Sequence, residues 1–168
     1  MKGFCLLFAA TIAASLLCSC SEAEKSQPSN EAIERFVGVA VFDDGVWSEQ
    51  EEKAIAETAK HYSIDKMEFM AALQSVIEAM DTIPESKYYG FLSEIDVNIQ
   101  EHGEELFDKA LDIAVCDKEV NGQESRRLLD IAKVLGFKPE DATLKIAEKS
   151  NQKGAKIKHW SNHIYCLW

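Results

Sequence analysis

The sequence DGVWSEQE at residues 44–51 recurs in altered form as DKEVNGQE at residues 117–124, at an offset of 73 residues. Each copy contains an acidic turn, one apolar residue (Trp47 or Val120), a helix-capping residue, and a glutamate three positions after the cap. An apolar, helix-like run precedes each copy, and a second one follows it. This self-similarity predicts two related helix-turn-helix units packed around a pseudo-twofold axis.

Between Glu31 and about Ser150, apolar residues recur with helical rather than alternating spacing. Only Pro84 and Pro139 interrupt the pattern, and each suits the first turn of a helix. We expect seven helices, which begin at or just after Asn30, Ser48, Asp65, Pro84, Gly103, Asn121 and Pro139. Their inward faces are predicted to include Ile33, Phe36, Ile55, Phe69, Leu73, Leu106, Phe107, Leu128 and Ile146. The predicted fold is therefore all-α, a compact bundle of about seven helices built from the two repeats.

The first twenty residues are typical of a bacterial lipoprotein signal peptide. A positive start at Met1-Lys2 precedes an apolar run over residues 4–17, which is too short to span a bilayer core of ~30 Å. The sequence Leu17-Cys18-Ser19-Cys20 then resembles a lipobox, with Cys18 at a position where Ala, Ser or Thr is usual. We expect residues 1–19 to be removed and Cys20 to be lipidated. The alternative is an ordinary secretory signal.

The remainder divides by composition into a polar tether at residues 20–30, a helical domain at residues 31–150 and a basic, aromatic tail at residues 151–168. A lipid on Cys20 would anchor the protein to a membrane of the bacterial cell envelope without a transmembrane helix. Ser21 after that cysteine favours the periplasmic face of the outer membrane if the host is Gram-negative.

The acidic balance limits the kinds of partner. The chain has 29 acidic and 18 basic residues, a formal net charge of −11, which argues against nucleic acid as a ligand. Cations and basic proteins remain compatible with it. Beyond the tether, Cys116 and Cys166 are left in a compartment that would be oxidising, where they either form a disulfide or stay as two thiols.

The two turns resemble a known family signature. The stretches VAVFDDG at residues 39–45, followed by Glu51, and IAVCD at residues 113–117, followed by Glu124, are similar to Ala-x-Ala-Asp-Gly-x-Val-x-x-x-Glu of the tellurite-resistance TerB-like family. IAKVLGFKPE at residues 131–140 is also close to a family element, and the resemblance covers about residues 31–148.

The resemblance implies a non-enzymatic, all-helical domain linked to envelope stress and tellurite resistance, with acidic surfaces proposed to bind divalent metal. Both copies depart from the signature. Phe42-Asp43 in the first copy and Cys116 in the second replace the small residue before the aspartate, and Lys118 replaces the glycine of the second copy.

The acidic turns are the first candidate site, formed by Asp44 and Glu51 in one copy and by Asp117 and Glu124 in the other. Their spacing imitates the second half of a calcium-binding EF-hand loop, but the first half supplies no carboxylates. Two interpretations stay open. In the first, the aspartates stabilise turns and the glutamates cap helices. In the second, both turns together form a weak divalent-cation site.

The tail is the second candidate site. On a helix, His159, His163 and Cys166 would share one face, and these residue types suit zinc or copper. The alternatives are an interaction motif and simple packing of the tryptophans, Trp160 and Trp168, against the domain or the membrane interface.

No catalytic motif is present: the sequence has no Gly-rich phosphate loop, no nucleophile elbow and no H-E-x-x-H. We therefore expect a protein that is not an enzyme and that has no obligatory cofactor. The two main hypotheses are a lipid-anchored interaction module with a protein partner and a divalent-cation binding protein or sensor, and a purely structural lipoprotein spacer is a third.

Overall fold

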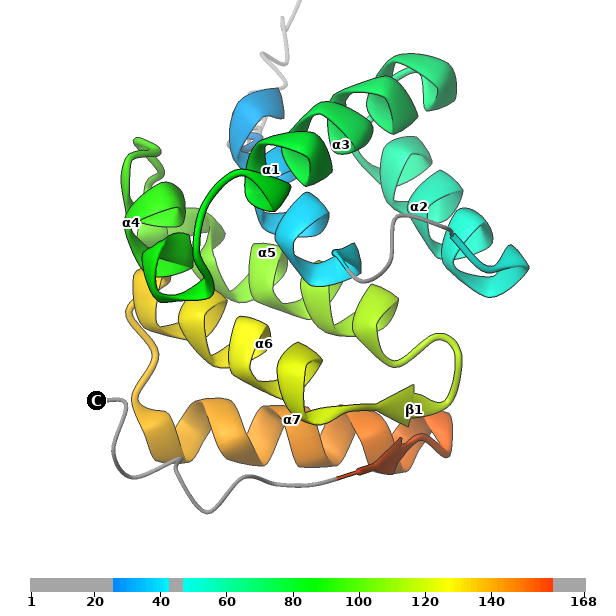
Figure 1. The fold of residues 1–168 in the computed structure, drawn as a ribbon, viewed down its shortest axis with the longest axis vertical. Coiled ribbons are helices and arrows are strands. Elements are labelled where there is room, and N and C mark those ends of the chain that lie inside the picture. Colours follow the sequence, from blue (N-terminus) through cyan, green and yellow to red (C-terminus); the bar gives the residue numbers. More distant parts are fainter. Residues whose placement is uncertain (1–25, 43–46, 159–168) are drawn as a thin grey trace, which may run out of the picture.

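The computed structural model describes residues 26–42 and 47–158 (Figure 1). The predicted signal peptide at residues 1–19 lies outside these residues, as do Cys20, Asp44, His159, His163 and Cys166. The described part has seven α-helices, α1 Asn30–Val41, α2 Glu49–His61, α3 Lys66–Asp81, α4 Tyr88–Ser93, α5 Ile99–Ala114, α6 Gly122–Val134 and α7 Pro139–Lys153. A 3-10 turn, η1 Glu85–Lys87, and two short strands, β1 Glu119–Val120 and β2 Lys156–Ile157, complete it. The all-α prediction is confirmed.

The repeat is larger than the sequence indicated. The offset of 73 residues relates the start of α2 at Glu49 to that of α6 at Gly122, and the start of α3 at Lys66 to that of α7 at Pro139. Each copy therefore has three helices, α1–α3 and α5–α7, and η1 with α4 joins them. Helices α3 and α7 lie on opposite outer sides of the molecule, with α1 and α5 between them (Figure 1).

One hydrophobic core spans both copies. Helix α1 packs mainly against α5 and α3, while α4 covers α6. Every predicted inward residue named above is buried, and the fully buried large side chains are Phe36, Phe69, Phe107, Ile33, Ile55, Leu73, Met80, Leu92, Leu106, Ile113, Leu128 and Ile131. Because these residues come from α1, α2, α3, α4, α5 and α6, the two repeats share one apolar interior.

Local sequence sets most helix starts, with two corrections. Ser29, rather than Asn30, caps α1, since its side chain accepts a hydrogen bond from the amide of Ala32. Helix α5 begins at Ile99, so Gly103 lies inside the helix and not before it. A Cβ at Gly103 would lie 3.3 Å from the carbonyl oxygen of Leu135, which explains a small residue where α5 passes the end of α6.

The described helices include none that is both long and apolar enough to cross a membrane. The two-stranded parallel pair was not predicted, because strands of two residues leave no periodic signal. Glu119 pairs with Lys156 and Val120 with Ile157, which fixes the chain after α7 against the turn between α5 and α6 (Figure 1).

Candidate functional site: the two acidic turns

The glutamates of both turns act as helix caps. The amide of Ser48 donates to Glu51 Oε2 at 2.7 Å, and the amide of Glu51 donates to Ser48 Oγ at 3.2 Å. In the second copy, the amide of Asn121 donates to Glu124 Oε2 at 2.6 Å, and the amide of Glu124 donates to Asn121 Oδ1 at 3.0 Å. Both are complete capping boxes, which confirms the predicted structural role of the two glutamates.

Asp117 stabilises its own turn and leaves carboxylate surface for other contacts. The amide of Glu119 donates to Asp117 Oδ1 at 2.8 Å, while the side chain of Asp117 is exposed. The next residue, Lys118, has a positive φ of 69°. This is the position where the family signature has glycine, so the left-handed turn is retained although the residue has a Cβ.

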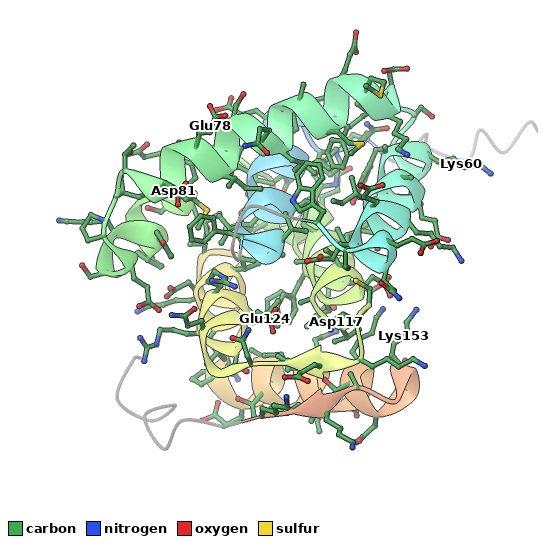
Figure 2. All side chains as sticks on the ribbon, turned by 45° about the vertical axis from the view of Figure 1, so that its right-hand side comes forward. Lys60, Glu78, Asp81, Asp117, Glu124 and Lys153 are labelled. Atoms are coloured by element: carbon green, nitrogen blue, oxygen red, sulfur yellow. The ribbon has the colours of Figure 1, made fainter. Side chains whose placement is uncertain are left out.

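The fold brings the two turns close to one thiol. Burial, followed by the negative charges of Glu51 and Asp117, raises the pKa of Cys116 to about 12. A carboxylate of the first copy and one of the second therefore lie close enough to Cys116 to act on it together. Figure 2 shows Asp117 and Glu124 below the outer helix α3, which carries Glu78 and Asp81.

The described residues contain no group of three or more His, Cys, Asp or Glu side chains placed to hold a metal ion. Asp44 lies outside those residues, so the proposed shared cation site and its four carboxylates stay a prediction. The same is true of the tail site at His159, His163 and Cys166. Within the described residues, Cys116 is a free cysteine, and its pairing with Cys166 also stays a prediction.

A buried arginine next to the first turn was missed from sequence. The side chain of Arg127 on α6 is only 4% exposed, and its guanidinium lies 5.6 Å from the ring centre of Phe42, the last described residue before the first turn. Burial raises the pKa of the neighbouring Tyr88, and the charge of Arg127 opposes this effect. Its place beside Leu128 and Leu129, on the predicted inward face of α6, was the one available signal.

Part of the predicted tether is bound to the domain, which sequence also did not reveal. Ser26 Oγ donates to Glu101 Oε1 at 2.5 Å and lies 3.3 Å from His102 Nε2. Gln27 Nε2 donates to the carbonyl of Tyr62 at 3.0 Å, and Pro28 is buried. Polar residues with no apolar period gave no indication of this contact, which joins Ser26 to the start of α5 and Gln27 to the end of α2.

The comparison with known proteins agrees with these features. A family model described as Tellurite resistance protein TerB matches residues 29–145. This chain belongs to the TerB family. No curated protein and no solved structure matches it significantly.

The matched region of this TerB-family chain begins at the α1 cap and ends within α7, so it contains both acidic turns. It is nearly the span of about residues 31–148 that the sequence motifs indicated. The chain therefore carries a tellurite-resistance-related module, and the strand β2 follows the matched region.

Proposed function

We propose that this protein is a lipid-anchored, non-catalytic TerB-family module of the cell envelope that binds a protein partner through the acidic face where its two repeats meet. The observation that carries the proposal is the joint effect of Glu51 and Asp117 on Cys116, because it brings carboxylates of both copies to one face. A net charge of −11 favours a partner with a basic surface.

The test of this proposal is co-purification from cross-linked envelope membranes with a charge-neutral variant of the turns. The double variant Asp44→Asn and Asp117→Asn keeps a side-chain oxygen that can accept the amide of Glu119, so the turn should fold. We expect the partner to be lost from this variant. The matched control is Glu78→Gln with Asp81→Asn, which removes the same charge from the outer helix α3 (Figure 2).

Retention of the partner by the turn variant, or equal loss from both variants, would contradict an interaction through the acidic face. In the first case the partner binds elsewhere, and in the second the attraction depends only on the overall charge.

A divalent-cation binding protein is the second candidate, and the same convergence of Glu51 and Asp117 favours it. The metal-stripped protein should be titrated with Ca²⁺, Mg²⁺ and Zn²⁺ by calorimetry. Stoichiometric micromolar binding that disappears in the Asp44→Asn and Asp117→Asn variant would support a cation sensor. Loss of binding in His163→Ala would instead assign the metal to the tail. Flat traces for all three ions would refute the cation-binding proposal.

Lipidation is tested separately by metabolic labelling with a palmitate analogue. We expect label in the unaltered protein and in Cys18→Ser, which changes the neighbouring cysteine to a residue usual in a lipobox. Cys20→Ser should lose the label and leave the membrane fraction. Label that persists in Cys20→Ser would exclude that residue as the attachment site.

A further inference from the structure

A basic groove lies beside the acidic turns, where α2 meets the ends of α5 and α7. Its volume is about 350 Å³, and four lysines from four different segments line it. Lys53 comes from α2, Lys109 from α5, Lys118 from the turn after α5, and Lys153 from the end of α7. Figure 2 shows Lys153 at this corner of the molecule. A concentration of positive charge in one groove contrasts with a net charge of −11 for the chain.

The carboxylates of the groove pair with Lys153 but not with the other three lysines. Asp112 Oδ1 lies 3.0 Å from Lys149 Nζ and 3.3 Å from Lys153 Nζ, so its charge is already shared between two lysines of α7. Glu57 is the other acidic residue of the lining. Among the described residues, no carboxylate lies within ion-pair distance of Lys53, Lys109 or Lys118. The groove therefore presents ammonium groups in excess.

The backbone at Lys118 indicates that this lysine is not required by the fold. Its φ of 69° is sterically disfavoured for a residue with a Cβ and is favourable for glycine. The contact that the turn makes here uses the backbone, since the amide of Lys156 donates to the carbonyl of Lys118 at 2.9 Å. Glycine would preserve that hydrogen bond. The lysine side chain contributes an ammonium group to the groove in spite of the strain.

Part of the lining between the lysines is apolar or uncharged. Ala54, Val115 and Cys116 contribute to it. Because the pKa of Cys116 is raised to about 12, its thiol stays neutral at physiological pH and adds no negative charge. Such a surface accommodates the carbon skeleton of a ligand, while the ammonium groups contact its anionic groups.

We propose that this groove binds a small organic anion that carries two or three carboxylate or phosphate groups. Lys53, Lys109 and Lys118 contact the anionic groups, and Ala54 and Cys116, which are half-buried, contact the carbon skeleton. The groove borders the acidic face of the turns at Cys116, and it takes a ligand of opposite charge. It does not depend on the protein-partner proposal.

The experiment is calorimetric titration of the protein, purified in a mild non-ionic detergent, with citrate and with 3-phosphoglycerate. Citrate has only carboxylates, whereas 3-phosphoglycerate has a carboxylate and a phosphate. Comparing their affinities shows which anionic group the site prefers. Inorganic phosphate, which has no carbon skeleton, is the reference ligand. We expect at least one organic anion to bind, and to bind more tightly than inorganic phosphate.

Two variants in the groove and one control variant test whether the anion binds in the groove. Lys53→Gln and Lys118→Gly should each weaken binding by about tenfold, as loss of a charge-assisted hydrogen bond would. Lys118→Gly should also unfold at the same or a higher temperature, so its weaker binding cannot come from a damaged fold. Lys60→Gln makes the same charge change on the same helix, near its other end (Figure 2), and should leave affinity within about twofold.

The proposal is overturned if neither organic anion binds at millimolar concentration or if inorganic phosphate binds as tightly as they do. It is also overturned if Lys118→Gly keeps full affinity, or if Lys60→Gln weakens binding as much as Lys53→Gln.

Discussion

Gly38 lies on the side of α1 that faces α3, and its missing side chain determines how closely the two helices approach. A Cβ at this position would lie 2.5 Å from Val76 Cγ1 and 2.8 Å from Val76 Cβ. The second distance involves an atom fixed to the backbone, so rotation of the valine side chain cannot relieve the contact. An added methyl group would therefore force the two helices apart.

We expect Gly38→Ala to lower the free energy of unfolding by about 2 kcal/mol, because overpacking outweighs the gain of about 1 kcal/mol in helix propensity. Urea denaturation measures the change. Gly90→Ala is the matched control, since no heavy atom lies within 4 Å of a Cβ added to that helical glycine, and it should be neutral or stabilising. Val76→Ala combined with Gly38→Ala should recover part of the loss. Full stability of Gly38→Ala alone would refute the close contact.

Asp130 of α6 is a half-buried carboxylate with an altered pKa. Burial and the nearby charge of Glu85 disfavour its ionised form and outweigh the opposing effects of Lys133 and Arg126, so its pKa rises to about 6. The unfolded value is about 3.9, so the folded state binds more protons between those two pH values. The free energy of unfolding should therefore fall as the pH rises from about 4 to about 6.

Asp130→Asn should remove the free-energy cost of ionising Asp130 in the folded protein. It should raise the free energy of unfolding by about 1 kcal/mol at pH 8, a value reduced for solvent screening. At pH 4 the variant and the unaltered protein should have nearly equal stability. Urea titrations at both pH values measure the difference. Asp96→Asn, at an exposed position between α4 and α5, should change stability at neither pH. A loss of stability in Asp130→Asn at pH 8 would show that the ionised carboxylate stabilises the fold.

At the scale of the helices, the caps connect sequence to structure most directly. Asn121 Oδ1 accepts the amides of Gln123 at 2.8 Å and Glu124 at 3.0 Å, which would otherwise lack partners in the first turn of α6. Asn98 occupies the corresponding position before α5, but its side chain makes no capping hydrogen bond to the helix backbone. The two asparagines therefore differ in what they contribute to helix stability.

Replacing Asn121 by alanine should lower the free energy of unfolding by about 1–2 kcal/mol, measured by urea denaturation. Asn98→Ala is the matched control and should cost less than about 0.5 kcal/mol. Equal effects of the two substitutions would mean that the hydrogen bonds of Asn121 contribute no more than its helix-boundary position does.

Residues that act through their immediate neighbours were predictable from the sequence. The caps at Ser48, Asp65 and Asn121, and Pro139 at the first turn of α7, each acted as expected. The predicted start of α5 was wrong because Gly103 does not mark a helix boundary. A small residue is needed there because the carbonyl of Leu135 lies close to it in the folded protein.

Features that depend on contacts between distant segments could not be predicted from the sequence. The pairing of β1 with β2 joins parts of the chain that only the packing of α7 brings together. The groove around Lys118 depends on the same packing, since its lining comes from α2, α5 and α7. Of the candidate site, the capping role of Glu51 and Glu124 was predicted correctly, while the binding of Ser26 and Gln27 to the domain was not.

For the whole molecule, the shared core means that neither repeat has an interior of its own. Ile33 and Phe36 of α1 belong to the same buried cluster as Leu106 and Phe107 of α5. Each half on its own would expose these faces to water, and a unit of this size buries too little apolar surface to offset its chain entropy.

We therefore expect residues 29–82 and residues 83–158, produced separately, to be largely unfolded by circular dichroism. An equimolar mixture should regain helical signal, because each half supplies the surface that the other lacks. The intact chain should show a single transition in thermal and urea unfolding. A sigmoidal unfolding transition in either isolated half would show that one repeat folds independently.

The attachment of Ser26 and Gln27 to the domain has a consequence for where the protein can act. Under the lipidation proposed above, only residues 21–25 separate the acylated Cys20 from Ser26, a maximum reach of about 20 Å. The segment binds α5 at Glu101 and His102, so the end of this helix at Ala114, next to the acidic turn, lies about 18 Å farther along it. A lipidated Cys20 would therefore keep the domain close to the membrane, and any partner or ligand would bind it within a few nanometres of the bilayer.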